Sequence, residues 1–218
     1  MVAMARQALL AGATGLVGRE LADQLAASEQ YDTVHVLVRR AVPQLASKPK
    51  LVEHVVDFDA LPSLPATDDV YVALGTTIKV AGSEQAFRRV DYDYVLAVAR
   101  KGRAAGARRL GVVSALGADE KSRVFYNRVK GEMQEAVTEL GYDSVVIAQP
   151  SLLLGDREAL GQPTRAGEVW ARRLFEPVSG LIPARVRPVR ARAVAAALLG
   201  GVLAAPPGVS FVENRAML

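Results

Sequence analysis

Gln7-Ala8-Leu9-Leu10-Ala11-Gly12-Ala13-Thr14-Gly15-Leu16-Val17-Gly18 is the stretch that decides how the rest of this chain is interpreted. An apolar run leads directly into glycines spaced G-x-x-G-x-x-G, and an amphipathic pattern follows. This order predicts a buried strand, a tight turn through which backbone approaches a pyrophosphate, and a helix whose positive end faces the anion. A glycine turn without a ligand is the alternative. The predicted cofactor-binding residues here are Gly12, Thr14, Gly15, Leu16, Val17 and Gly18.

The bulk composition fits one globular domain over residues 1–218. Half of the 218 residues are hydrophobic, which is enough for a sizeable core. The absence of cysteine excludes disulfides, thiolate nucleophiles and cysteine-ligated metals. The net charge of +4 is spread as arginine pairs, a pattern typical of solvated helix faces. We expect no nucleic-acid partner, no membrane segment of roughly 18 apolar residues, and a cytoplasmic location.

Strand and helix signals alternate along the chain. Strands are expected over residues 7–11, 33–38, 51–58, 69–74, 109–113, 143–148 and 208–213. Helices are expected over residues 16–27, 83–104, 122–140, 168–175 and 191–205. This order predicts an α/β fold, a doubly wound parallel sheet of six to seven strands with helices on both faces. Residues 151–190 are richer in Gly, Pro and Arg, and we expect them to form a small C-terminal substrate or lid region.

The end of the second expected strand favours NADP over NAD. Dinucleotide sites usually carry an acidic residue there, which holds the ribose 2′-hydroxyl. This chain has Arg39 and Arg40 instead. A guanidinium pairs with a 2′-phosphate, whereas a carboxylate would repel it. NADP(H) is therefore the expected cofactor and NAD(H) the alternative, unless the two arginines are merely solvated loop residues.

The ends of the next two expected strands add to the predicted cofactor site. Asp57 and Phe58 end the third strand, where a carboxylate and a ring can frame an adenine. A turn residue beside a core aromatic is the other interpretation. Ala73, Leu74 and Gly75 end the fourth strand. Small residues at that place let a cofactor lie close, because ligands of such sheets bind outside the carboxyl ends of the strands.

Tyr126, Lys130 and Ser114 are the catalytic candidates. Tyr126 and Lys130 are spaced Y-x-x-x-K in an expected helix, so both side chains lie on one helix face. A nearby ammonium stabilises a phenolate, which makes a tyrosine usable as a general acid or base. Ser114 follows the fifth strand, and its hydroxyl can hold a substrate carbonyl. The alternative is a packed tyrosine with a solvated lysine.

The histidines carry no signal of a metal site. His35 and His54 fall in separate expected strands, without an acidic or histidine partner at ligand spacing. We expect them to be ordinary strand residues, with no metal ligands in the chain.

Several motifs together resemble the short-chain dehydrogenase/reductase superfamily. They are the glycine turn, Ser114, and the pair Tyr126 and Lys130. Further stretches resemble its atypical Tat-interacting-protein-like branch more narrowly. These stretches are residues 73–79 (ALGTTIK), 87–95 (FRRVDYDYV), 114–119 (SALGAD), 167–170 (GEVW) and 213–216 (ENRA). The resemblance therefore extends over essentially the whole chain.

The resemblance implies an NADP-binding Rossmann fold with a reductase-type Ser/Tyr/Lys set. It implies that Lys130 also holds the nicotinamide ribose and that Pro150 lies near the nicotinamide. Position 91 is Asp, where many relatives with full reductase activity carry an Asn that supports a proton relay through water. The branch also includes members with a regulatory role.

The leading hypothesis is thus an NADP(H)-dependent oxidoreductase that transfers hydride to or from a carbonyl or alcohol carbon. A regulatory or redox-sensing NADP-binding protein without turnover is the first alternative. A sugar-nucleotide epimerase or dehydratase is the second. The expected partner is a small-molecule substrate, and a homodimer is a possible assembly.

Overall fold

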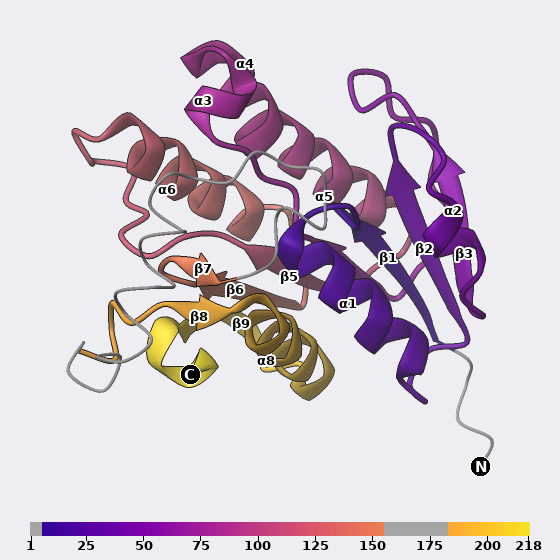
Figure 1. Ribbon diagram of the computed structural model, residues 1–218. Helices are drawn as coiled ribbons and strands as arrows, with labels where there is room; N and C mark the ends of the chain where they lie inside the picture. Colours follow the sequence, from indigo (N-terminus) through magenta and orange to yellow (C-terminus); the bar gives the residue numbers. More distant parts are fainter. Residues whose placement is uncertain (1–5, 155–182) are drawn as a thin grey trace.

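A computed structural model describes residues 6–154 and 183–218 of the chain. Within these residues, seven parallel strands form one central sheet (Figure 1). The strands are β1 (Gln7–Ala11), β2 (Thr33–Val38), β3 (Leu51–Val55), β4 (Asp69–Val72), β5 (Arg109–Val113), β6 (Ser144–Gln149) and β9 (Gly208–Glu213). Their order in space is β3-β2-β1-β4-β5-β6-β9, which is the order of a Rossmann fold. The predicted doubly wound sheet is confirmed.

Helices cover both faces of this sheet (Figure 1). The long helices are α1 (Leu16–Ala27), α5 (Tyr94–Ala104), α6 (Phe125–Thr138) and α8 (Ala191–Ala204). On β1, Leu10 packs into the core shared with α1 and α8, whereas Leu9 packs into the core shared with α5 and α6. Successive side chains of a strand point to opposite faces, so a strand covered on both sides must be apolar throughout.

The chain leaves β1 through α1 on one face and later leaves β4 toward α5 on the other. The carboxyl ends of these two neighbouring strands therefore lead away from each other. A crevice at such a divergence is where open α/β sheets bind their ligands. The topology thus places a ligand site between the glycine turn and the end of β4.

The helix expected over residues 83–104 is interrupted. It consists of α4 (Glu84–Arg88), a π-helical turn (Arg89–Asp93) and α5. Ser83 caps α4 as an N-cap should, because its Oγ accepts a hydrogen bond of 3.1 Å from the Ala86 amide. A π-helical turn is rare and is frequently found at functional sites. Here it carries Asp91 into the interior, where the side chain is fully buried.

Other expected bounds differ by a few residues. The strands expected over 51–58 and 69–74 end at Val55 and Val72, and the helix expected over 122–140 begins at Phe125. Apolar residues continue to pack against the core after each ladder ends, so the apolar pattern overestimates the strands. Among the described residues, further short elements were not expected: α2 (Pro43–Ala46), α3 (Ile78–Ala81), β7 (Leu153–Leu154), β8 (Val189–Arg190) and a 3₁₀ turn (Asn214–Met217).

Only the ends of the expected lid region, 151–190, belong to the described residues. There β7 pairs with β8 in a small parallel sheet of its own. The helix expected over 168–175 and the motif at 167–170 lie outside the described residues. The lid therefore stays a prediction.

The two histidines lie in strands, as expected, and they also contact each other, which the sequence spacing did not indicate. Because β2 and β3 are neighbours, His35 Nδ1 lies 3.0 Å from His54 Nε2. His35 Nε2 in turn lies 2.9 Å from Gln7 Oε1. Burial lowers the pKa of His35, and the nearby His54 lowers it further. His54, His35 and Gln7 thus connect the neighbouring strands β3, β2 and β1 through their side chains. Sequence spacing does not reveal these contacts.

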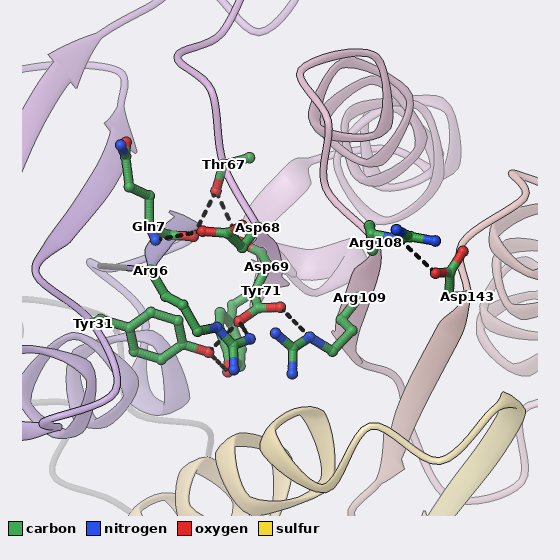
Figure 2. A network of polar contacts seen from close by, with 10 residues as sticks. All are labelled: Arg6, Gln7, Tyr31, Thr67, Asp68, Asp69, Tyr71, Arg108, Arg109 and Asp143. Carbon is green, nitrogen blue, oxygen red and sulfur yellow. Dashed lines mark hydrogen bonds and ion pairs between the residues drawn. The ribbon is translucent and has the colours of Figure 1, made fainter. Parts of the chain in front are cut away.

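A buried carboxylate joins the amino ends of the central strands (Figure 2). Asp69, the first residue of β4, is fully buried and forms ion pairs with Arg6 and Arg109. The Tyr31 hydroxyl donates to Asp69 Oδ2 at 2.6 Å and lies 2.8 Å from the Tyr71 hydroxyl. Burial and the charge of Asp69 raise the pKa of Tyr31, so this hydroxyl remains a donor. The network closes the end of the sheet opposite to the glycine turn.

Removing the charge of Asp69 should destabilise the fold far more than removing that of an exposed aspartate. Asp69→Asn leaves two guanidinium groups without their carboxylate, and we expect a loss of about 3 kcal/mol in unfolding free energy. The matched control is Asp143→Asn, which breaks an exposed pair with Arg108 (Nε–Oδ2 2.6 Å). That loss should stay below about 1 kcal/mol. Urea denaturation measures both, and equal losses would contradict this role of the network.

Candidate functional site

The glycine turn after β1 packs against the end of β4. Gly12 has φ +97°, and the Gly15 amide donates to its carbonyl oxygen at 3.0 Å. A Cβ on Gly12 would lie 2.5 Å from the Ala73 carbonyl carbon. A Cβ on Gly18 would lie 1.9 Å from the Gly12 oxygen. Only hydrogen fits at these two positions, which explains both glycines.

The turn leaves the amino end of α1 open. The N-cap residue is Gly15, which has no side chain to cap the first amides of the helix. Unpaired amides at a helix start carry partial positive charge and bind anions. Of the other predicted residues, Thr14 is exposed, Leu16 is half-buried and Val17 is buried in the core. Val17 thus packs with its side chain and can present only its backbone to a ligand.

A cavity of about 420 Å³ lies beside the ends of β2 and β3. It is lined by Arg39, Val55, Val56, Asp57, Phe58, Asp59 and Tyr94. The structure thus brings together three predicted residues, Arg39, Asp57 and Phe58. Arg39 and Arg40 are both exposed, but Arg40 does not line this cavity. Tyr94 was not predicted. It comes from α5, and its ring lies 5.5 Å from that of Phe58, centroid to centroid.

Charges in this cavity are partly balanced. The Arg89 Nε donates to Asp59 Oδ1 at 2.7 Å. This guanidinium lowers the pKa of the Asp59 carboxyl. The charged residues that line the cavity are Arg39, Asp57 and Asp59, and the charge of Asp59 is balanced by Arg89. Arg39 and Asp57 are therefore the charged groups that can bind a ligand there. One cation and one carboxylate match a ligand with an anionic group and hydrogen-bond donors.

Three elements meet at Lys130 of α6. Its Nζ lies 2.8 Å from Asp91 Oδ1, and both side chains are almost completely buried. Asp91 Oδ2 accepts a hydrogen bond of 2.8 Å from the Thr76 amide, just after β4. A Cβ on Gly75 would lie 3.4 Å from Asp91 Oδ1 and 3.9 Å from Lys130 Nζ. The end of β4, the π-helical turn and α6 therefore converge at one point.

Lys130 is a charged ammonium despite its burial. Burial lowers the pKa of Lys130, but the carboxylate of Asp91 and the phenol of Tyr126 outweigh this effect, and the pKa is raised. Asp91, which departs from the Asn of many reductases, thus acts as the counter-ion of Lys130.

Tyr126 lies four positions before Lys130 on α6, as their spacing predicted. The tyrosine is half-buried, and its ring packs at 5.4 Å, centroid to centroid, against the fully buried ring of Phe87. This packing holds the ring, and the side chain remains partly exposed.

Ser114 is buried directly after β5 and is held by a residue that was not predicted. Gln134 Nε2 donates to Ser114 Oγ at 2.6 Å. Pro150 flanks the same loop, because its carbonyl oxygen accepts from the Leu116 amide at 2.8 Å. Contacts among the described residues link Ser114 to α6 through Gln134, not directly to Tyr126. Gln134 follows Lys130 by four positions on α6, and that spacing is the only signal that could have found it.

A second cavity, of about 410 Å³, opens at the carboxyl ends of β5, β6 and β9. It is lined by Leu116, Gln149, Arg185, Glu213, Asn214 and Arg215. Asn214 is buried and fixes the rim. Its Oδ1 accepts from the Ser151 amide at 2.7 Å, and its Nδ2 donates to the carbonyls of Ala184 (2.9 Å) and Arg187 (2.8 Å).

The fold and the open glycine turn define a nucleotide-binding α/β protein. Residues 12–159 match the model of the NAD(P)H-binding family, and the chain belongs to this family. Protein FMP52, mitochondrial, from Eremothecium gossypii is 38% identical over 155 residues, 69% of this chain and 68% of that protein. Protein HTATIP2 from Rattus norvegicus is 32% identical over 222 residues, 98% of this chain and 88% of that protein. The resemblance to the Tat-interacting-protein-like branch is confirmed.

Solved structures agree on the fold. MoeE5 in complex with UDP-glucose and NAD gives a TM-score of 0.71 at 16% identity, covering 95% of this chain and 76% of that one. An oxidoreductase of the short-chain dehydrogenase/reductase family from Burkholderia thailandensis gives a TM-score of 0.68 at 19% identity. The match covers 99% of this chain and 93% of that one.

The expected cytoplasmic location is wrong. The relatives FMP52 from Eremothecium gossypii, Emericella nidulans and Candida albicans are named mitochondrial. The absence of cysteine, on which the expectation rested, does not specify a cellular compartment. In residues 6–154 and 183–218, every helix is too short or too polar to cross a membrane.

Gly18→Ala should impair cofactor binding. The added Cβ would overlap the Gly12 oxygen, so α1 must shift away from the turn. We expect affinity for the nicotinamide cofactor to fall about tenfold or more, measured by fluorescence titration with NADPH and NADH. The control is Gly200→Ala in α8, where the new Cβ meets open space. A Gly18→Ala variant that binds as tightly as this control would contradict the assignment of the turn.

Proposed function

We propose that this chain is an NADP(H)-dependent oxidoreductase that moves hydride between the cofactor and a carbonyl or alcohol carbon of a small molecule. The observation that carries the proposal is the convergence on Lys130. A buried ammonium, its counter-ion Asp91 and the accessible phenol of Tyr126 lie together beside the end of β4. In an NAD(P)H-binding fold this is the place where a ligand meets the sheet.

The described residues fit a dinucleotide along this edge of the sheet. The turn at Gly12 and Gly18 has no room for a Cβ and exposes the amides of α1, which suits a pyrophosphate. The cavity with Asp57 and Phe58 suits an adenine, and Arg39 on its wall suits a 2′-phosphate. When bound, the cofactor supplies a hydride donor or acceptor. Lys130, with three donor hydrogens, would hold the nicotinamide ribose.

The chain's own residues supply the proton chemistry. In the reducing direction the Tyr126 hydroxyl gives its proton to the carbonyl oxygen as the carbon receives hydride. The ammonium of Lys130 stabilises the phenolate that remains. Ser114 donates a hydrogen bond to the same oxygen and stabilises its developing charge. The cavity lined by Gln149 and Arg185 lies at the ends of β5 and β6, and we assign it to the rest of the substrate.

Tyr126→Phe tests the acid/base role. The variant keeps the ring against Phe87 but loses the proton, so kcat should fall at least about a hundredfold while NADPH binding is unchanged. The readout is NADPH oxidation with a substrate found in a carbonyl screen. Tyr142→Phe is the control, because Tyr142 bonds the Ala99 carbonyl in the core (2.6 Å), away from Lys130. Full turnover by Tyr126→Phe would contradict the assignment of Tyr126 as the general acid/base.

Arg39→Gln and Arg40→Gln test the preference for NADP. Arg39 lines the cavity proposed for adenine and Arg40 does not, so the two substitutions form a matched pair. We expect Arg39→Gln to weaken NADPH binding about tenfold, with NADH binding unchanged and Arg40→Gln close to wild type. Wild-type protein that prefers NADH would refute the role given to Arg39.

A regulatory NADP-binding protein without turnover is the second candidate. One observation favours it: Lys130 is already engaged by a carboxylate where many reductases have a neutral amide. Protein that binds NADPH tightly but oxidises it with no member of a carbonyl panel would support this role. A sugar-nucleotide epimerase has only the likeness in fold behind it.

A further inference from the structure

A third polar residue continues the face of α6 that carries Tyr126 and Lys130. Gln134 is four positions further on, and its side chain is buried. Residues four apart on a helix lie above one another, so the three side chains form one row. A buried amide in a helix destabilises the protein unless it is paired. Gln134 is paired, because its Nε2 donates to Ser114 Oγ at 2.6 Å. This hydrogen bond points to a role for Gln134 at Ser114.

Gln149 engages the oxygen end of the Gln134 amide, and the nitrogen end faces Ser114. Its Nε2 donates to Gln134 Oε1 at 3.3 Å. With Oε1 engaged by a donor, the Nε2 end of Gln134 is directed at Ser114 Oγ. An amide has donors at one end only. The hydrogen bonds therefore run in one direction, from Gln149 at the cavity wall through Gln134 to Ser114.

We propose that Gln134 is a positioning residue that keeps the hydroxyl hydrogen of Ser114 available for the substrate oxygen. A serine hydroxyl has a single hydrogen, and it rotates toward the best acceptor. Because Gln134 offers Ser114 a donor, the oxygen of Ser114 is occupied and its hydrogen points elsewhere. An acceptor at position 134 would take that hydrogen, leaving lone pairs to face a carbonyl oxygen. The inference rests on the proposed function, in which Ser114 bonds that oxygen.

Gln134→Glu reverses the polarity with almost no change in shape. An ionised carboxylate is acceptor-only, so Ser114 donates to it and is lost as a donor to substrate. We expect kcat for carbonyl reduction to fall about tenfold to a hundredfold at neutral pH, with KM for NADPH unchanged. The loss should recover as pH falls, because a protonated carboxyl again has a hydrogen to donate. Burial raises the pKa of such a carboxyl and the ammonium of Lys130, one turn away on α6, lowers it, so we expect the recovery below neutral pH.

Two further variants separate polarity from packing. Gln134→Met keeps the volume without a donor or a charge, so its smaller loss of kcat should not depend on pH. Gln30→Glu, an exposed glutamine before β2 at the far end of the sheet, controls for the added charge and should behave as wild type. A Gln134→Glu variant with wild-type kcat at all pH values would overturn the inference if Ser114→Ala lowers kcat. If Ser114→Ala also leaves kcat unchanged, the proposed role of Ser114 fails and the inference with it.

A measurement without turnover tests the same contact. The side-chain amide resonance of Gln134, assigned by its absence in Gln134→Met, should shift in Ser114→Ala because its acceptor is gone. An amide resonance that does not move would overturn the inference even if no substrate is known.

Discussion

The buried ion pair between Asp91 and Lys130 is the interaction on which the candidate site depends. It joins the π-helical turn before α5 to the middle of α6, and Asp91 also accepts a hydrogen bond from the Thr76 amide beyond β4. A lone buried charge is expensive, so neither side chain could remain inside without the other. The pair therefore holds a cation at the crevice where the sheet diverges. Tyr126 lies one turn before that cation on α6 and is half-buried, so it shares the candidate site with Lys130.

The fold keeps its two buried charge clusters at opposite ends of the same strands. β4 begins at Asp69, within the network of Arg6 and Arg109, and leads to the residues that contact Asp91. In the first cluster the Asp69 carboxylate is held by ion pairs and a tyrosine hydroxyl, and the cluster has a structural role (Figure 2). The second includes a half-buried tyrosine and borders open amides of α1. Burial of charge is thus common to both, and accessibility separates the candidate site from the structural network.

Sequence patterns predicted the features that depend on neighbouring residues in the chain. The glycine turn, the seven strands and the Tyr126–Lys130 spacing follow from short-range rules, because strand burial and helix periodicity are written in neighbouring residues. Contacts between distant segments did not follow. His35 meets His54 only because β2 pairs with β3, and Tyr94 reaches Phe58 only because α5 covers that part of the sheet. Position 91 was recognised as unusual, but its role needed the π-helical turn, which no propensity rule anticipates.

A crystal structure of the chain with NADP⁺ tests the central claim most directly. The account predicts the pyrophosphate at the amino end of α1, a ribose hydroxyl on Lys130 Nζ, and nicotinamide C4 on the side of Tyr126. Lys130 would then contact the ribose while keeping its bond to Asp91. A cofactor bound with its nicotinamide away from Lys130, or outside the glycine turn, would contradict it.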